Sequence, residues 1–281
     1  AAKAAMKVPK LLGAYYGYQY EYAGMGFCIN TAGHNALTPV LASPDIDFLV
    51  SPPSYGIRGP GEPGGDMKPF GSLATHGKLS LIEDDIRTHL TGPMGYGQGV
   101  NAEQTRMLLR RNWGMMLARK TPILMLPLCG GNDLDSDDIR TEMKQAARAG
   151  RLMLDEPRRS GVEVAMVTDE NSFRALRTYS DIRDSREKSW VVEPDGMVWQ
   201  RPRKTQYLTG NLLCYQRIPL QQFGAGVDCL LVDDVPAAVK RYKLWIFAGD
   251  FAANPGFRQA LAAIRARSEE HTSELQSRLH L

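Results

Sequence analysis

The sequence predicts an α/β protein in which parallel strands alternate with helices. Two observations support this expectation. Short apolar runs recur along the 281-residue chain, and most are followed by a segment with helical spacing. The pattern resets near residues 155–161, where Pro157 and the basic pair Arg158–Arg159 interrupt it. We therefore expect two parts, residues 1–156 and residues 160–266.

The first part contains four expected strands. They are the apolar runs at residues 10–16, 46–50, 79–82 and 122–127. Helices are expected over residues 33–41 and 101–120, and from residue 136 onward. Asn101 with Gln104 three residues later is a helix-start pair. The Gly- and Pro-rich residues 51–71 are expected to form a loop, which would either carry function or be disordered.

Four strands, each followed by a connection, amount to half of an eight-stranded (β/α)8 barrel. A half barrel leaves edge strands exposed and should not be stable alone. The opening residues Ala1 to Met6 lack an initiator methionine and read like the end of a helix. We therefore expect the first part to be half of a barrel in a chain that is a fragment.

The second part is expected to be a smaller, doubly wound α/β domain. Its strands are expected at residues 162–167, 227–232 and 243–247, and its helices after Asp169, over 207–218 and over 257–265. Between them, residues 181–204 form a polar, Pro-rich region.

The last residues, 267–281, resemble the in-frame translation of a sequencing adapter. A natural polar helical tail is the alternative that the composition permits. We expect residues 267–281 not to be native and exclude them from fold reasoning.

Composition excludes several classes of function. The chain is 43% hydrophobic but has no apolar run long enough to span a membrane. Its net charge is +3, or +4 once the two arginines and three glutamates of residues 267–281 are removed, which is too small to indicate nucleic-acid binding. Four scattered cysteines, without a CxxC pair or a histidine at ligand spacing, predict no metal site and no disulfide framework. We expect no cofactor, and the sequence indicates no compartment.

The run from Lys78 to Thr88 is the main candidate for chemistry. It places Glu83 at the carboxyl end of an apolar strand and follows it with Asp84, Asp85 and Arg87. Parallel α/β folds keep their active sites at such strand ends. Arg87 would orient Glu83 and favour its ionised form. The alternative is a solvated strand end in which Arg87 makes a surface ion pair.

Several segments together resemble one family. They are Tyr15–Tyr18, Gly33–His34, Ser43–Phe48, Ser51–Arg58 and Gly77–Thr88. This series is similar to the carboxyl half of the catalytic barrel of the glycoside hydrolase family 42 β-galactosidases and their distant relatives. The resemblance implies that residues 1–156 form the carboxyl half of the barrel and that their four strands are its fifth to eighth. Residues Glu163–Val167, Gly226–Asp228 and Tyr242–Leu244 resemble that family's trimerisation domain, an amidotransferase-like α/β unit. The resemblance covers roughly residues 10–265.

The resemblance implies a retaining glycoside hydrolase that acts on β-linked sugars, with Glu83 as the nucleophile. In such enzymes a second carboxylic acid, about 5 Å away, protonates the leaving oxygen. The family's acid/base glutamate ends the fourth strand, which would lie before Ala1. Asp85, two residues along the same loop, is a poor substitute. We therefore expect the chain as given to hydrolyse nothing. The resemblance also implies a homo-oligomer, a trimer.

Candidate substrate-binding residues follow from the same resemblance: Tyr16, Tyr18, Tyr55, Arg58 and Asp85. Each tyrosine has a packing alternative. His34 is expected to be a helix-start residue rather than a catalyst. The chain departs from its relatives at residues 123–128, which lack the aromatic residues and aspartate that they often carry there. This departure puts galactose specificity in doubt.

Two rival functions stay open. The first is a non-catalytic carbohydrate-binding or assembly protein with a degenerate barrel. The second is a class I amidotransferase-like enzyme, which would need a nucleophilic cysteine with a histidine partner. Cys214 falls within an expected helix and Cys229 within an expected strand, and no histidine occurs between His89 and His271. The sequence therefore does not favour amidotransferase chemistry.

Overall fold

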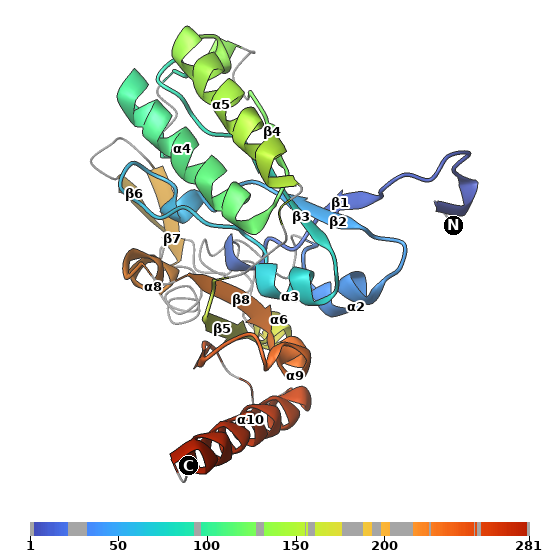
Figure 1. Cartoon of the computed structure of the whole chain (residues 1–281). Coiled ribbons are helices and arrows are strands. Elements are labelled where there is room, and N and C mark those ends of the chain that lie inside the picture. Colours follow the sequence, from blue (N-terminus) through green and yellow to red (C-terminus); the bar gives the residue numbers. More distant parts are fainter. Residues whose placement is uncertain are drawn as a thin grey trace.

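The structure is a computed structural model. It describes residues 3–21, 33–92, 97–127, 132–154, 156, 161–175, 188–192, 198–202, 216–224, 226–249, 251 and 254–279. Two sheets of parallel strands, with four and three strands, form its centre (Figure 1), and an antiparallel pair forms a separate two-stranded sheet. The expected α/β class with parallel sheets is confirmed.

The four-stranded sheet has its strands in chain order. They are β1 (Gly13–Tyr15), β2 (Phe48–Ser51), β3 (Leu79–Asp84) and β4 (Ile123–Met125). Each corresponds to an expected strand. β3 continues two residues beyond the expected end, so that Glu83 pairs with Leu124 and Asp84 with Met125 inside the sheet. The carboxylates therefore belong to the strand itself, and its pleat decides which way each points.

The two faces of this sheet differ in exposure. On one face Leu49 packs with Leu37 and Leu41 of α2 (Leu37–Ala42) and Leu73 of α3 (Phe70–Thr75) in a buried cluster. The opposite face carries Tyr15, Leu79 and Leu124, whose exposed fractions are 53%, 42% and 47%. The registers of β1 with β2 and of β2 with β3 put Tyr15, Val50 and Leu81 in one row of this face. We call it the open face, and Glu83 lies on it, two residues after Leu81.

Two long helices follow β3 and β4. α4 (Ala102–Arg119) begins after Asn101, whose side chain accepts a 2.9 Å hydrogen bond from the Gln104 amide. This contact confirms the expected helix start. α5 (Asp137–Leu154) packs along α4 (Figure 1), and Trp113 and Ile139 lie in their shared apolar cluster.

The three-stranded sheet has the order β8 (Val227–Leu231), β5 (Val164–Thr168), β9 (Leu244–Phe247). The first of these strands in the chain is central, and the later two lie on either side of it, which is a doubly wound order. The helices of this part are α6 (Glu170–Ala175), α8 (Arg217–Gln222), α9 (Val235–Ala238) and α10 (Gly256–Leu279). Short 3-10 helices cover Lys3–Ala5, Tyr55–Ile57, Asn132–Leu134 and Val232–Asp234.

Apolar packing and hydrogen bonds join the two sheets. α3 packs against β8 (Figure 1), where the Leu231 amide donates a 2.7 Å hydrogen bond to Ser72 Oγ. Tyr20, from the first part, packs with Met166 of β5 in a buried cluster. The division into residues 1–156 and 160–266 as separate domains stays a prediction, as does the half barrel.

The polar, Pro-rich residues 181–204 contain regular structure that the sequence analysis did not predict. β6 (Lys188–Val192) pairs antiparallel with β7 (Val198–Pro202), and Val191 pairs with Trp199. Valine and tryptophan favour strands, and the polar residues between them concealed that preference. Most of the expected helix at 207–218 falls outside the described residues, and α8 begins at Arg217. α10 continues through the backbone of residues 267–279, where Glu, Leu, Gln and Arg are good helix formers.

Candidate active site

Glu83 lies at the carboxyl end of β3 on the open face, and it is 9% exposed. The hydroxyl of Tyr15, at the end of β1, donates a hydrogen bond to Glu83 Oε2. That hydrogen bond, followed by burial, raises the pKa of Tyr15, so the phenol stays a protonated donor. Sequence reasoning missed Tyr15 and chose Tyr16. Only the register of β1 on β2 and β3 shows that Tyr15 shares a face with Glu83.

Asp85 lies at the centre of a buried charge cluster next to Glu83. Arg58 Nη1 donates to its Oδ1 at 2.5 Å, and Arg87 Nη1 donates to its Oδ2 at 2.9 Å. The Tyr55 hydroxyl donates to the same Oδ2 at 3.2 Å, and the Arg58 guanidinium lies 4.3 Å from the centre of the Tyr55 ring. Arg58, Asp85 and Arg87 are 2%, 3% and 8% exposed, so they are not the solvated strand end that was the alternative.

The contacts within this cluster bear on the roles predicted for its four residues. The structure brings together Arg87, expected to orient Glu83, and Tyr55, Arg58 and Asp85, expected to bind substrate, through contacts with each other. Arg87 also donates to the Asp85 carbonyl oxygen at 2.8 Å. That Arg87 orients Glu83 stays a prediction. Direct contacts of a sugar with Tyr55, Arg58 and Asp85 also stay predictions.

Asp84 points to the opposite face of the sheet from Glu83, as neighbouring residues of a strand do. Its two oxygens each lie 3.1 Å from the Asn112 side-chain nitrogen of α4, which donates to them. Burial raises the pKa of Asp84 to about 6. Asp84 is therefore a carboxylate of the helix-covered face rather than a partner of Glu83.

Tyr16 and Tyr18 lie after β1 in an aromatic group with His34. The Tyr18 and His34 rings stack with centroids 4.1 Å apart, and the Tyr16 hydroxyl donates to the Asn35 carbonyl oxygen. Burial lowers the pKa of His34. Tyr16 also packs against the buried cluster of Leu37 on the helix-covered face. These contacts favour the packing alternative, and a sugar platform at Tyr16 and Tyr18 stays a prediction.

The loop between β2 and α3 is packed against the sheet by polar side chains that the sequence analysis missed. Asp66 Oδ2 accepts from Ser80 Oγ of β3 at 2.7 Å, and Asp66 Oδ1 lies 2.9 Å from Lys68 Nζ. Lys68 is 1% exposed, and burial lowers its pKa while the charge of Asp66 opposes that effect. The Gly- and Pro-rich composition predicted a loop but did not reveal its anchors.

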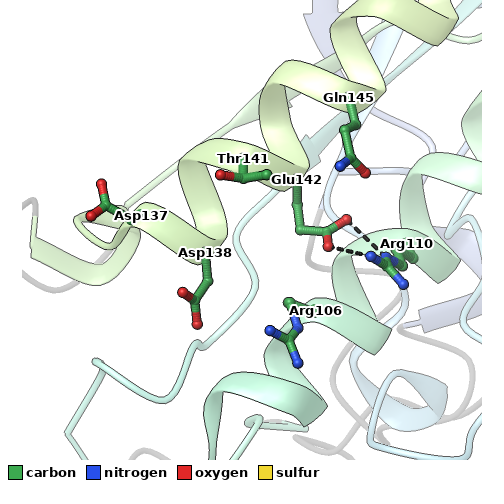
Figure 2. Close-up of a pocket in the computed structure, with 7 residues that line it drawn as sticks. All are labelled: Arg106, Arg110, Asp137, Asp138, Thr141, Glu142 and Gln145. Carbon is green, nitrogen blue, oxygen red and sulfur yellow. Dashed lines mark hydrogen bonds and ion pairs between the residues drawn. The ribbon is translucent and has the colours of Figure 1, made fainter.

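A surface groove lies away from this cluster, between α4 and α5. It has a volume of about 380 Å³, and its lining is polar: Arg106, Arg110, Asp137, Asp138, Thr141, Glu142 and Gln145 (Figure 2). Arg110 Nε donates to Glu142 Oε2 at 2.8 Å across it. None of the predicted site residues lines this groove, so it does not extend the candidate active site.

The described residues contain no group of three or more His, Cys, Asp or Glu side chains that could hold a metal ion. In the same part of the chain, no helix combines the length and apolar character needed to cross a bilayer. Cys229 lies within β8, and burial raises the pKa of its thiol to about 11, which disfavours a nucleophilic thiolate. Cys214 lies outside the described residues.

Comparisons with protein-family models, curated proteins and solved structures find no match to this chain.

Proposed function

We propose that this chain is the nucleophile-bearing part of a retaining glycoside hydrolase that acts on β-linked sugars, similar to a β-galactosidase. In this proposal the four-stranded sheet is the carboxyl half of a (β/α)8 barrel, and its open face is the barrel interior. One observation carries the proposal: Glu83 lies one residue before the end of a parallel strand, on the open face, and accepts a hydrogen bond from Tyr15. Catalytic carboxylates of such barrels occupy strand ends of this kind.

The chemistry would proceed through Glu83 in two steps. Its carboxylate attacks the anomeric carbon, a glycosyl ester forms, and the bond to the leaving oxygen breaks. Water then hydrolyses the ester and regenerates the carboxylate. Tyr15 binds Oε2, which supports attack by Oε1.

The leaving oxygen must receive a proton from a second carboxylic acid. The two acids next to Glu83 are unsuited to this role, because Asp84 faces α4 and Asp85 is paired with two arginines. Among the described residues we therefore find no acid/base partner at these positions. This supports the expectation that the chain as given does not turn over ordinary glycosides.

An activated substrate tests the nucleophile without the acid. Dinitrophenolate departs without protonation, and fluorine at C2 slows hydrolysis of the glycosyl ester. We expect 2,4-dinitrophenyl 2-deoxy-2-fluoro-β-galactoside to release up to one dinitrophenolate per chain and to leave a sugar adduct on Glu83, found by peptide mass spectrometry. Glu83→Gln should form no adduct. No adduct on the wild-type chain, or an adduct on another residue, would contradict the proposal.

A non-catalytic assembly protein is the second candidate. The exposed apolar side chains of Tyr15, Leu79 and Leu124 on the open face favour it, because exposed apolar surface on one face of a sheet can mark an interaction site. A homo-oligomer, including the trimer that the resemblance implies, belongs to this proposal. An unlabelled Glu83 in a chain that light scattering shows to be oligomeric would favour this candidate over the glycosidase.

A further inference from the structure

Arg217, the first residue of α8, reaches from the second part of the chain into the loop that carries Tyr55 and Arg58. It is 2% exposed. Its Nη1 donates to the Asp66 carbonyl oxygen at 2.7 Å, and its Nη2 donates to Ser54 Oγ at 3.2 Å. The guanidinium also lies 5.1 Å from the centre of the Tyr20 ring. A single side chain therefore holds both ends of the loop between β2 and α3.

The contacts continue from Arg217 to Tyr55. Ser54 Oγ donates to Glu21 Oε2 at 2.5 Å, and the Tyr55 amide donates to the same oxygen at 3.1 Å. Burial raises the pKa of Glu21, whereas the hydrogen bond from Ser54 and the charge of Arg217 oppose that effect. The charge of Arg217 thus offsets part of the cost of burying the Glu21 carboxylate. Glu21 in turn binds the backbone amide of Tyr55.

From Tyr55 the contacts reach the strand that carries Glu83. The Tyr55 hydroxyl donates to Asp85, which also binds Arg58 and Arg87. The Asp85 amide in turn donates to the Glu83 carbonyl oxygen at 3.1 Å. Hydrogen bonds and ion pairs thus connect Arg217 to Glu83 through Ser54, Glu21, Tyr55 and Asp85.

We infer that Arg217 is a positioning residue for the candidate active site: through Ser54 and Glu21 it sets the place of Tyr55 and thereby the Asp85 cluster beside Glu83. The expected effect on the reaction of Glu83 rests on the proposed function. The expected effect on the position of the Asp85 cluster does not. A purely stabilising role explains the site less well, because buried ionic groups are weak contributors to stability. Glu21 Oε1 and Arg217 Nε are moreover buried without a hydrogen-bond partner among the described residues, which is costly.

Arg119 provides a matched control. It also crosses from the first part to the second, where its Nη2 donates to the Val227 carbonyl oxygen at 3.3 Å and lies 3.8 Å from Asp228. Its guanidinium lies 4.6 Å from the centre of the Phe70 ring. Within the described residues these contacts lie apart from the Ser54, Glu21 and Tyr55 contacts, so Arg119→Gln weakens the junction and leaves that chain of contacts in place.

The experiment measures hydrogen exchange and Glu83 labelling in the full chain. We expect Arg217→Gln to raise amide exchange at least tenfold in residues 51–58 and 83–88, and to lower the rate constant for labelling by 2,4-dinitrophenyl 2-deoxy-2-fluoro-β-galactoside at least tenfold at saturating reagent. Arg119→Gln should leave both within about twofold of wild type, even if the two variants lose similar thermal stability. Arg217→Lys, which keeps the charge, should recover part of the loss.

The outcomes separate the two ideas. If Arg217→Gln leaves exchange in residues 83–88 unchanged, or if Arg119→Gln raises it equally, the positioning inference is wrong whether or not Glu83 is labelled. If wild-type Glu83 is not labelled but exchange in residues 83–88 responds to Arg217→Gln alone, the glycosidase proposal fails and the positioning inference stands. If Arg217→Gln does not fold, the same comparison is made between Arg217→Lys and Arg119→Lys.

Discussion

The carboxyl ends of the two parallel sheets both carry acidic residues, but they use them differently. After β3, the buried Asp85 is paired with two arginines, and Glu83 accepts from Tyr15, whose side chain is 53% exposed. After β5, Asp169 is fully buried and its Oδ1 accepts from the Asn171 amide and the Asn254 side chain, at 3.0 and 2.8 Å. The first end contains buried ion pairs, whereas Asp169 is bound by neutral donors.

Asp85 after β3 lies beside the open face, whereas Asp169 after β5 holds loops together. Asp169 joins the start of α6 to the segment before α10, and Glu170 accepts from the Leu37 amide at 2.6 Å, which ties α6 to α2. Acids at the carboxyl end of a parallel strand are therefore not sufficient evidence of a site. The open face beside Glu83 is what distinguishes the first sheet.

The largest effect should come from Asp85→Asn. The substitution keeps the size of the side chain but removes the negative charge that Asp85 supplies to the buried Arg58 and Arg87. Breaking a buried ion pair in this way costs about 3–5 kcal/mol in the free energy of unfolding. Urea unfolding of the full chain, followed by tryptophan fluorescence, measures it.

Asp169→Asn is the control from the other sheet. Its amide oxygen keeps the acceptor for Asn171 and Asn254, and its new nitrogen takes the place of Oδ2, which has no described partner. We expect a loss below about 1.5 kcal/mol, within the range of a single hydrogen bond. If Asp169→Asn and Asp85→Asn lower the free energy of unfolding equally, the contrast between neutral donors at Asp169 and buried ion pairs at Asp85 is wrong.

The next effect concerns pH and Asp84. Its pKa is raised to about 6 by burial, against a usual value of 3.8. The folded state therefore binds a proton before the unfolded state does, and this group's contribution to stability rises as pH falls from above 6 towards 4. Between pH 8 and pH 4 the wild type should gain about 2 kcal/mol relative to Asp84→Asn.

Unfolding free energies of the wild type and Asp84→Asn across this pH range measure that gain. Asn can still accept one hydrogen bond from Asn112, so the change with pH, rather than the difference at one pH, is the informative quantity. Parallel curves for the two proteins would show that Asp84 does not carry a raised pKa.

The smallest effect on stability should come from Tyr15→Phe. Because Tyr15 is exposed, the free energy of unfolding should change by less than about 0.5 kcal/mol. The labelling of Glu83 should nevertheless slow, because one carboxylate oxygen loses its hydrogen bond. Tyr20→Phe is the matched variant: it removes a buried 3.0 Å contact with Thr168 Oγ1 and should cost about 1 kcal/mol without affecting Glu83. Equal labelling rates in all three proteins would exclude a role for Tyr15 at Glu83.

The sequence by itself determined the parallel strands and the position of Glu83 at a strand end. These features are local, because an apolar run and the polar residue that ends it are read within a few residues. The start of α4 is local in the same way, since Asn101 and Gln104 lie three residues apart and contact each other. The antiparallel pairing of β6 and β7 was not predicted, because polar residues separate the short segments that favour strands.

Only the tertiary structure decided which side chains meet. Tyr15 rather than Tyr16 contacts Glu83 because the register of three strands puts it on the open face, and a shift of one residue would reverse that choice. Arg217 and Ser54 are 163 residues apart in the chain, yet they are hydrogen-bonded. Such contacts depend on the packing of one sheet against the other, and no local pattern in the sequence encodes that packing.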